Sequence, residues 1–141
     1  MSNKIKEKIT KDRIERANAI SEVESFNLAV DLEKIPPFIS TTLSEALILG
    51  LIRQGVKKYI SVLGHGSTEI GEVLRIYEQA GVIKTYPVRN EISGTHAAMA
   101  LRWVRGEKAA VITSIGPGAL QAFAASLTAA SNGIGLWFLF G

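Results

Sequence analysis

The segment VIKTYPVRNEISGTHAAMALRWVRGEKAAVITSIGPG, residues 82–118, decides the fold of this chain. Its apolar start predicts a strand over 82–86, which is followed by an alanine-rich helix over 92–104 and by a second strand over 109–114. Glu91 stands where the first strand gives way to the helix, and a Gly-Pro-Gly turn closes the segment. In parallel α/β sheets, ligands bind beyond such strand ends.

The same alternation of helix and strand extends to both sides of this segment. Further helices are predicted over 42–54, 68–80 and 117–130, and further strands over 59–63 and 136–140. In the first of these helices, Thr42 and Glu45 form a capping-box pair and Gly55 ends the helix. Its predicted apolar face comprises Leu43, Ala46, Leu47 and Leu51.

This alternation predicts an α/β domain over 40–141, with a mainly parallel sheet and helices on both faces. Its strands are continuously apolar, as expected of strands that helices cover on both sides. Gly141 directly follows the last predicted strand and no helix comes after it, so we expect a domain that is incomplete or covered by another chain.

Residues 1–39 form a charged helical arm in which acidic and basic residues are equally frequent. Apolar residues recur there at nearly helical spacing, which predicts a narrow apolar stripe of Ile5, Ile9, Ile14, Ala17 and Ile20. Pro36 and Pro37 then end any helix. Two interpretations are open: a solvated extension of the domain, and an arm that packs on another subunit.

Composition narrows the functional classes. The 141 residues are 47% hydrophobic, with a mean hydropathy of +0.20 and a net charge of +3. The charge forms no basic stripe, so we expect no nucleic-acid partner. No stretch approaches the roughly 20 apolar residues that span a bilayer, and no secretory signal is recognisable, so we expect a cytoplasmic protein without a membrane partner. The absence of cysteine excludes thiolate chemistry.

Three loops that follow predicted strands should meet at one edge of the sheet, because parallel strands share the side on which their carboxyl ends lie. These loops are Gly64-His65-Gly66-Ser67, Arg89-Asn90-Glu91 and Ile115-Gly116-Pro117-Gly118. The pattern therefore predicts a ligand site formed by all three.

From residue 41 to 141, the order of elements resembles the N-terminal pyrimidine-binding domain of thiamine-diphosphate enzymes in the acetolactate synthase and pyruvate decarboxylase superfamily. In that family a strand ends in a glutamate, and a Gly-Pro-Gly turn begins 25 residues later, as Glu91 and Gly116 are spaced here.

The triplet Arg89-Asn90-Glu91 and the turns at 64–66 and 114–118 are most similar to the trihydroxycyclohexanedione hydrolase branch, which opens a ring by C–C hydrolysis. Ile92 departs from the Gln that the family usually has after the glutamate.

The resemblance implies that Glu91 activates thiamine diphosphate. In the family, this carboxyl group hydrogen-bonds N1′ of the aminopyrimidine and favours the imino tautomer, whose 4′-nitrogen takes the thiazolium C2 proton. The implied reaction cleaves or forms a C–C bond next to a carbonyl of a small substrate, as a lyase, carboligase or hydrolase. Without the resemblance, a Glu at this position is explained by the helix dipole.

The resemblance also places Gly116, Pro117 and Gly118 at a subunit interface beside the pyrimidine. Asn90 and Gln121 are further candidates for cofactor binding.

Both histidines have a structural alternative. His65 is a candidate catalytic residue that donates to a substrate oxygen or shuttles a proton, because imidazole titrates near neutrality. Its alternative is a polar turn residue. His96, on the alanine-rich helix, is expected to be a core residue.

We expect the metal of such an enzyme to be bound outside this chain. The family anchors its diphosphate through Mg²⁺ held by a Gly-Asp-Gly…Asn motif in a second domain, and Mg²⁺ requires oxygen ligands. Asp12 and Asp31 are the only aspartates here, and both lie in the arm. The resemblance therefore implies a diphosphate-binding subunit or domain as partner, in a homo- or hetero-oligomer that forms a split enzyme or a longer one.

Two other functional classes differ from this one in the sequence features that they require. A non-catalytic assembly subunit with the same fold stays open, although the intact Glu91 disfavours it. A nucleotide-binding doubly wound domain is disfavoured, because no Gly-x-Gly-x-x-Gly follows the first strand.

Overall fold

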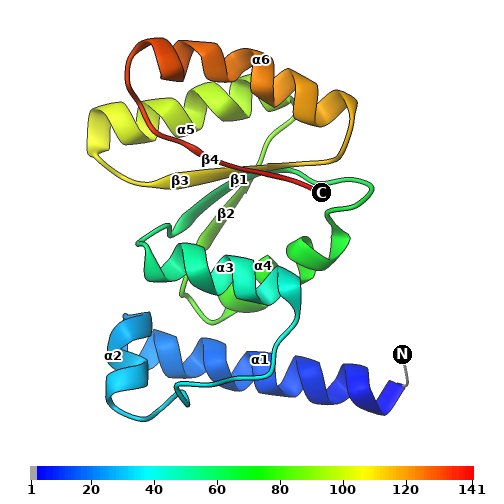
Figure 1. Ribbon diagram of the computed structural model, residues 1–141, viewed down its shortest axis with the longest axis vertical. Helices are drawn as coiled ribbons and strands as arrows, with labels where there is room; N and C mark the ends of the chain where they lie inside the picture. Colours follow the sequence, from blue (N-terminus) through cyan, green and yellow to red (C-terminus); the bar gives the residue numbers. More distant parts are fainter. Residues whose placement is uncertain (1–2) are drawn as a thin grey trace.

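The computed structural model describes residues 3–141 and has an α/β architecture (Figure 1). Its helices are α1 (Asn3–Val23), α2 (Phe26–Asp31), α3 (Leu43–Arg53), α4 (Thr68–Gln79), α5 (Glu91–Arg105) and α6 (Pro117–Ser131). Its strands are β1 (Lys58–Val62), β2 (Lys84–Pro87), β3 (Ala109–Thr113) and β4 (Trp137–Phe140). The strands form one sheet in the order β2-β1-β3-β4, and every neighbouring pair is parallel. The predicted fold class is therefore confirmed.

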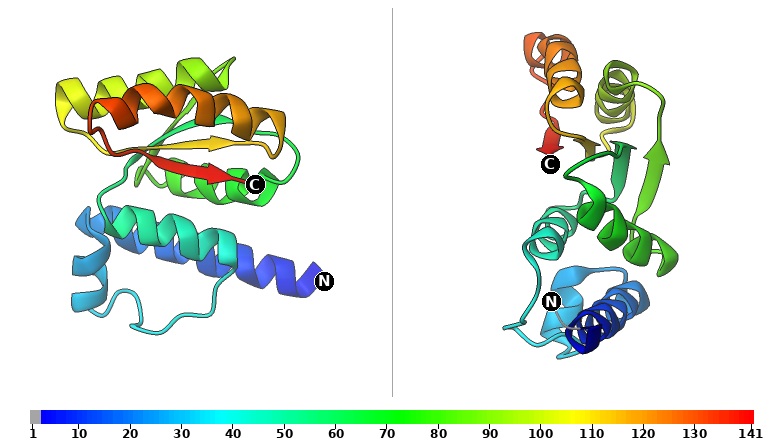
Figure 2. Two further views of the ribbon diagram at one scale, coloured as in Figure 1. Left: turned by 45° about the horizontal axis from the view of Figure 1, so that its top comes forward. Right: turned by 90° about the vertical axis from the view of Figure 1, so that its right-hand side faces the viewer.

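Helices cover both faces of the sheet. α5 and α6 lie on one face and α3 and α4 on the other, while α1 and α2 form a further layer outside α3 and α4 (Figure 1 and Figure 2). All five positions of β3 are buried. This is why β3 is apolar at residues that point to either face, since neither face meets solvent.

The strand order creates a point at which the connections diverge. β1 and β3 are hydrogen-bonded neighbours although β2 lies between them in the sequence. The connection from β1 to β2 runs through α4 on one face, whereas the connections through α5 and α6 run over the other (Figure 1). In open parallel sheets, the carboxyl ends of strands at such a point form the usual ligand site.

α5 packs unusually close to the sheet, because it carries a glycine where it crosses β1. A Cβ added at Gly94 would lie 3.0 Å from Val88 Cγ2 and 3.1 Å from Ile60 Cγ2. Ala98, one turn further on, is fully buried in the same layer. Small residues on the inner side of α5 thus hold its first turn, and Glu91 with it, against the strands.

The predicted apolar face of α3 is wrong in part. Leu51 is buried, but Leu43 is 78% exposed and Leu47 is 46% exposed. The buried side chains of α3 are Glu45, Ile48, Leu49, Leu51 and Ile52. Apolar residues occur around most of this helix, so their spacing alone does not show which face is buried. The buried face is set by packing against the sheet on one side and α1 on the other.

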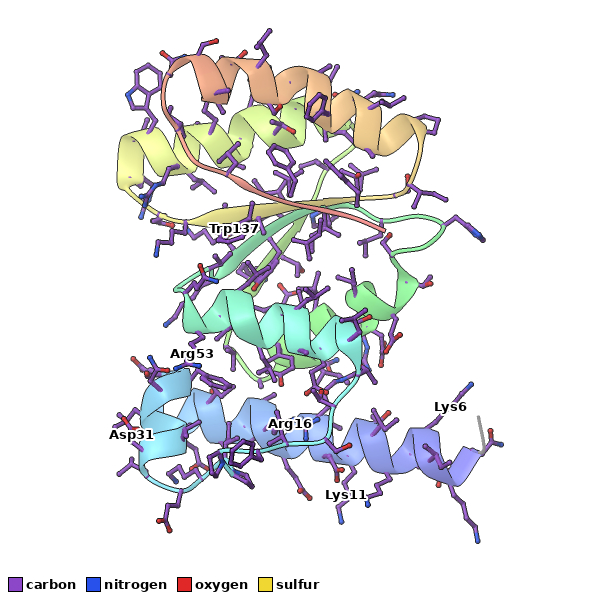
Figure 3. The ribbon with its side chains drawn as sticks, viewed as in Figure 1. Lys6, Lys11, Arg16, Asp31, Arg53 and Trp137 are labelled. Carbon is purple, nitrogen blue, oxygen red and sulfur yellow. The ribbon has the colours of Figure 1, made fainter. Side chains whose placement is uncertain are left out.

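The arm packs on its own chain. Ala17 and Ile20 of α1 belong to the same hydrophobic core as α3 and α4. Arg16, midway along α1 and labelled in Figure 3, is buried and forms an ion pair with Glu45 of α3. The arm is therefore no solvated extension, and the face that it buries is used within the chain.

The predicted stripe of the arm is correct at its end and wrong at its start. Ile5 and Ile14 are about half exposed, at 51% and 44%. The first turns of α1 project past the rest of the domain (Figure 1). Arg13 and Arg16 are buried although neither belongs to the predicted apolar stripe.

No helix among residues 3–141 is long and apolar enough to span a membrane.

Candidate functional site

The three loops predicted to converge do meet at the carboxyl edge of the sheet. A Cβ added at Gly64, after β1, would lie 2.9 Å from Ser114 Cβ, after β3. A Cβ added at Gly118, at the start of α6, would lie 2.8 Å from Oε1 of Glu91, which follows β2. The glycines thus allow the loops to approach closely, and the carboxylate of Glu91 lies against the glycine turn.

Glu91 is held by the first turn of α5. Asn90 caps this helix, with its Oδ1 accepting a hydrogen bond from the Ser93 backbone N at 3.1 Å. The Thr95 hydroxyl donates to the Glu91 carbonyl oxygen at 2.9 Å. Glu91 itself is half-buried. Its charge is favoured at a helix start, where the backbone N–H groups carry partial positive charge.

Asn90 and Gln121 lie side by side across the site. The Asn90 side-chain amide donates to Gln121 Oε1 at 3.3 Å, which links the start of α5 to the second turn of α6. Gln121 is exposed. The structure thus brings together two residues that the sequence predicted for cofactor binding, and their binding role stays a prediction.

The two glycines of the Gly-Pro-Gly turn serve different purposes. Gly116 has φ +64°, a conformation that favours glycine. Pro117 opens α6, where its fixed φ suits the first helical position. Gly118 is buried, and the space that its Cβ would fill is taken by the side chains of Glu91 and Ser114.

His65 stands on the exposed turn after β1. Ser67 braces this turn, because its hydroxyl accepts from the Gly64 N–H at 3.0 Å and contacts the Gly64 carbonyl oxygen at 3.1 Å. His65 is exposed, and its side chain has no hydrogen bond within the described residues. Its catalytic role stays a prediction. His96 is half-buried rather than enclosed in the core.

The sequence analysis missed Ser114 as a site residue. Its Oγ would lie 2.7 Å from a Cβ at Gly118 and 3.4 Å from one at Gly64, so it stands between the loops. The signal in the sequence was its position at the end of β3, directly before the glycine turn. A single serine there has no motif of its own, and only the sheet order places it between two other loops.

A cavity of about 350 Å³ lies elsewhere, between α2 and the amino ends of β1 and β2. Phe26, Arg53 and Lys57 are among the residues that line it. Because ligands of parallel sheets bind at the opposite, carboxyl ends, this cavity is separate from the site around Glu91. Among residues 3–141, no cluster of three or more His, Cys, Asp or Glu side chains is arranged to hold a metal ion.

The α/β domain is similar in sequence to known proteins. Residues 41–141 match the family model of the thiamine pyrophosphate enzyme, N-terminal TPP binding domain. The chain is 40% identical over 82 residues to 3D-(3,5/4)-trihydroxycyclohexane-1,2-dione hydrolase of Bacillus subtilis (strain 168), covering 56% of this chain and 13% of the relative. It is 38% identical over 109 residues to the hydrolase of the same name from Bacillus velezensis, covering 68% of this chain and 17% of the relative.

The matched segment thus spans less than a fifth of the length of these relatives. The family match covers the whole α/β domain, from the residue before the N-cap of α3 to the end of the chain. The chain therefore belongs to the thiamine pyrophosphate enzyme family, through its N-terminal cofactor-binding domain.

Proposed function

We propose that this chain is the pyrimidine-binding half of a thiamine-diphosphate enzyme that cleaves or forms a C–C bond next to a carbonyl, with Glu91 activating the cofactor. The observation that carries the proposal is the position of the Glu91 carboxylate against Gly118, at the edge where the loops after β1, β2 and β3 meet. The family match supports the cofactor.

The residues at this edge fit an aminopyrimidine ring. Because Gly118 has no side chain, the Glu91 carboxylate can lie against the backbone of the glycine turn. The Glu91 carboxylate makes no hydrogen bond within residues 3–141 and is available to a ring nitrogen. Asn90 and Gln121 add amide groups at the same helix starts. When bound, thiamine diphosphate supplies the electron sink that allows a bond next to a carbonyl to break or form.

Glu91 has one task in this scheme, which is to hold a proton between its carboxyl oxygen and the ring nitrogen. A half-buried carboxyl group suits this task, because limited contact with water keeps the hydrogen bond directed to the ring. His65, on the neighbouring loop, is proposed to donate to a substrate oxygen.

A second protein surface is needed to hold the diphosphate and its Mg²⁺. Leu120, Phe123 and Leu127 are 69%, 68% and 70% exposed and form one outward stripe along α6. The helix that carries this stripe begins at the glycine turn, whose Gly118 lies against Glu91. Large exposed apolar surfaces mark interaction sites. We infer that a diphosphate-binding subunit or domain covers α6 and carries the metal ligands.

The relatives suggest the class of reaction. Both are hydrolases of a trihydroxycyclohexane-dione, which is a cyclic diketone. We propose the same class for the assembled enzyme, with hydrolysis of a C–C bond next to a ring carbonyl.

The decisive experiment replaces Glu91 by Gln. The variant chain carries an affinity tag, is expressed in the source organism and is purified together with the partners that it binds there. Gln keeps the shape of the side chain but cannot hold the acidic proton, so hydrolysis of the cyclic diketone should slow by about 10²–10⁴-fold. The exchange of the thiazolium C2 proton with D₂O should slow in parallel.

The matched control is Glu69→Gln. Glu69 also lies in the first turn of a helix, α4, so this variant changes the interaction with a helix dipole in the same way. Near-normal turnover in Glu91→Gln, or an equal loss in Glu69→Gln, would contradict the proposed role. An assembly that binds no thiamine diphosphate with Mg²⁺ would favour a non-catalytic assembly subunit.

A further inference from the structure

We propose that Ser114 is a positioning residue for Glu91, and that its hydroxyl hydrogen-bonds the Glu91 carboxylate through one bridging water molecule. In the sequence, Ser114 is only the first residue of the turn at 114–118, and the pattern assigns it no role. The proposal starts from the space beside Gly118, where both side chains end.

Two oxygen atoms share this space. The point that a Cβ of Gly118 would occupy is 2.7 Å from Ser114 Oγ and 2.8 Å from Glu91 Oε1. The two oxygens therefore lie no further apart than these two distances added together. The gap between them is thus no wider than one water molecule can bridge with hydrogen bonds of about 2.8 Å to each side.

Among the described residues 3–141, neither oxygen has another hydrogen-bond partner. Within residues 3–141, the side-chain hydrogen bonds that involve Glu91 and Ser114 use their backbone carbonyl oxygens, which accept from Thr95 and Thr113. The carboxylate and the hydroxyl can therefore both form a hydrogen bond with the same water molecule. Polar groups this close to the interior usually find a partner in protein or in ordered water.

Ser114 is the more firmly placed of the two. It follows β3, which is buried at every position, and its Cβ packs against Gly64 at the end of β1. The side chain of Glu91 has three rotatable bonds and starts at the end of a helix. A fixed hydroxyl on the sheet therefore limits the conformations of a flexible carboxylate on α5.

The consequence for the reaction rests on the proposed function, whereas the contact itself does not. Holding the carboxylate beside Gly118 keeps it aimed at the place where the ring would lie. Loss of Ser114 should then lower the rate at which the bound substrate reacts more than it changes substrate binding.

The contact is tested first on the full chain without cofactor. In protein labelled with ¹³C at glutamate, the Cδ resonance of Glu91 is assigned by its loss in Glu91→Gln. Ser114→Ala should move this resonance and leave that of Glu69 in place. The matched control is Ser93→Ala, which removes an exposed hydroxyl from the first turn of α5. An unmoved Glu91 resonance in Ser114→Ala, or an equal change in Ser93→Ala, overturns the proposal.

The second readout uses the assembled enzyme. Ser114→Ala should lower kcat about tenfold, as expected for the loss of one hydrogen bond, with KM little changed. A raised KM with unchanged kcat would contradict a positioning role. If the proposed function fails instead, Glu91→Gln stays active while the resonance still moves in Ser114→Ala, so the two failures are distinguishable.

Discussion

The guanidinium of Arg16 on α1 donates two hydrogen bonds to the carboxylate of Glu45 on α3, from Nε to Oε1 at 2.9 Å and from Nη2 to Oε2 at 2.7 Å. Glu45 is fully buried. It also accepts from the hydroxyls of Tyr77 at 2.9 Å and Thr41 at 2.6 Å. This network joins the arm to α3 and α4, so the arm is part of the folded domain although the family match begins only at residue 41.

Removal of Arg16 should destabilise the whole domain. Arg16→Ala removes the main partner of buried Glu45 and leaves Arg13 Nε 3.4 Å from its Oε2, so the loss should be about 3 kcal/mol of unfolding free energy, the lower end for breaking a buried ion pair. Urea unfolding followed by circular dichroism measures this loss. The control is Lys11→Ala, whose ion pair with Glu15 is exposed and is worth at most about 1 kcal/mol. Equal losses in the two variants would show that the buried pair does not anchor the arm.

Stability should fall in acid, partly because of Glu45. Burial alone would raise the pKa of Glu45, but the hydrogen bonds from Arg16, Thr41 and Tyr77 outweigh burial and lower this pKa below its ordinary value. Such a group stabilises the fold fully at pH values above its unfolded-state pKa, and this contribution is lost as the pH falls through the folded-state pKa. The unfolding free energy should therefore decline below about pH 4.3, the ordinary glutamate value, and remain level above it as far as Glu45 is concerned.

Comparison with Glu45→Gln isolates this contribution. Hydrogen bonds and ion pairs also lower the pKa of other glutamates, namely Glu72, Glu78 and Glu107. These groups are common to both proteins and cancel in the difference. Urea unfolding at pH 7, 5, 4 and 3 should show a smaller loss for Glu45→Gln than for the wild type. If the unfolding free energies of both proteins fell in parallel with pH, Glu45 would not be a source of the acid instability.

Gly118→Ala should disable the site without unfolding the chain. The new methyl group would lie 2.7 Å from Ser114 Oγ and 2.8 Å from Glu91 Oε1, so both side chains must move. We expect the native assembly to lose affinity for thiamine diphosphate, measured by calorimetric titration with Mg²⁺ present. The control is Gly50→Ala in α3, where nothing lies within 4 Å. That variant should gain about 0.5–1 kcal/mol of stability. Unchanged cofactor affinity in Gly118→Ala would show that cofactor binding does not depend on the absence of a side chain at residue 118.

Polar substitution of the α6 stripe should release the partner. The double variant Leu120→Ser, Phe123→Ser changes side chains that are 69% and 68% exposed, so the unfolding free energy should change by only about 0.5 kcal/mol per site. Assembly with the diphosphate-binding subunit, measured by light scattering after gel filtration, should be lost. Leu43→Ser, at a 78% exposed site on the opposite side of the sheet, should assemble normally. The surface assignment fails if the double variant assembles as the wild type does.

Part of the candidate site was predictable from the order of strands and loops along the chain. Strands that run parallel bring the loops after them to one edge, so Glu91, the glycine turn and the His65 turn were expected together. Ser114 was not expected as a site residue, because a serine before the glycine turn suggests no role by itself. Its close approach to Gly64 depends on the pairing of β1 with β3.

The arm shows the same limit. Periodic spacing of apolar residues predicts a helix, but it assigns charged residues to solvent. Arg13 and Arg16 are buried instead, because Glu45 of α3, far along the chain, forms an ion pair with each of them. A local pattern contains no information about such partners.

By itself, the sequence determined the alternation of helix and strand, the parallel sheet and the place of Glu91 at a strand end, because each depends on the spacing of neighbouring residues. The tertiary structure alone decided which face of α3 is buried, where the arm packs and that Ser114 shares a space with Glu91. These features depend on contacts between residues distant in the chain, whose burial and pairing energies outweigh local preference.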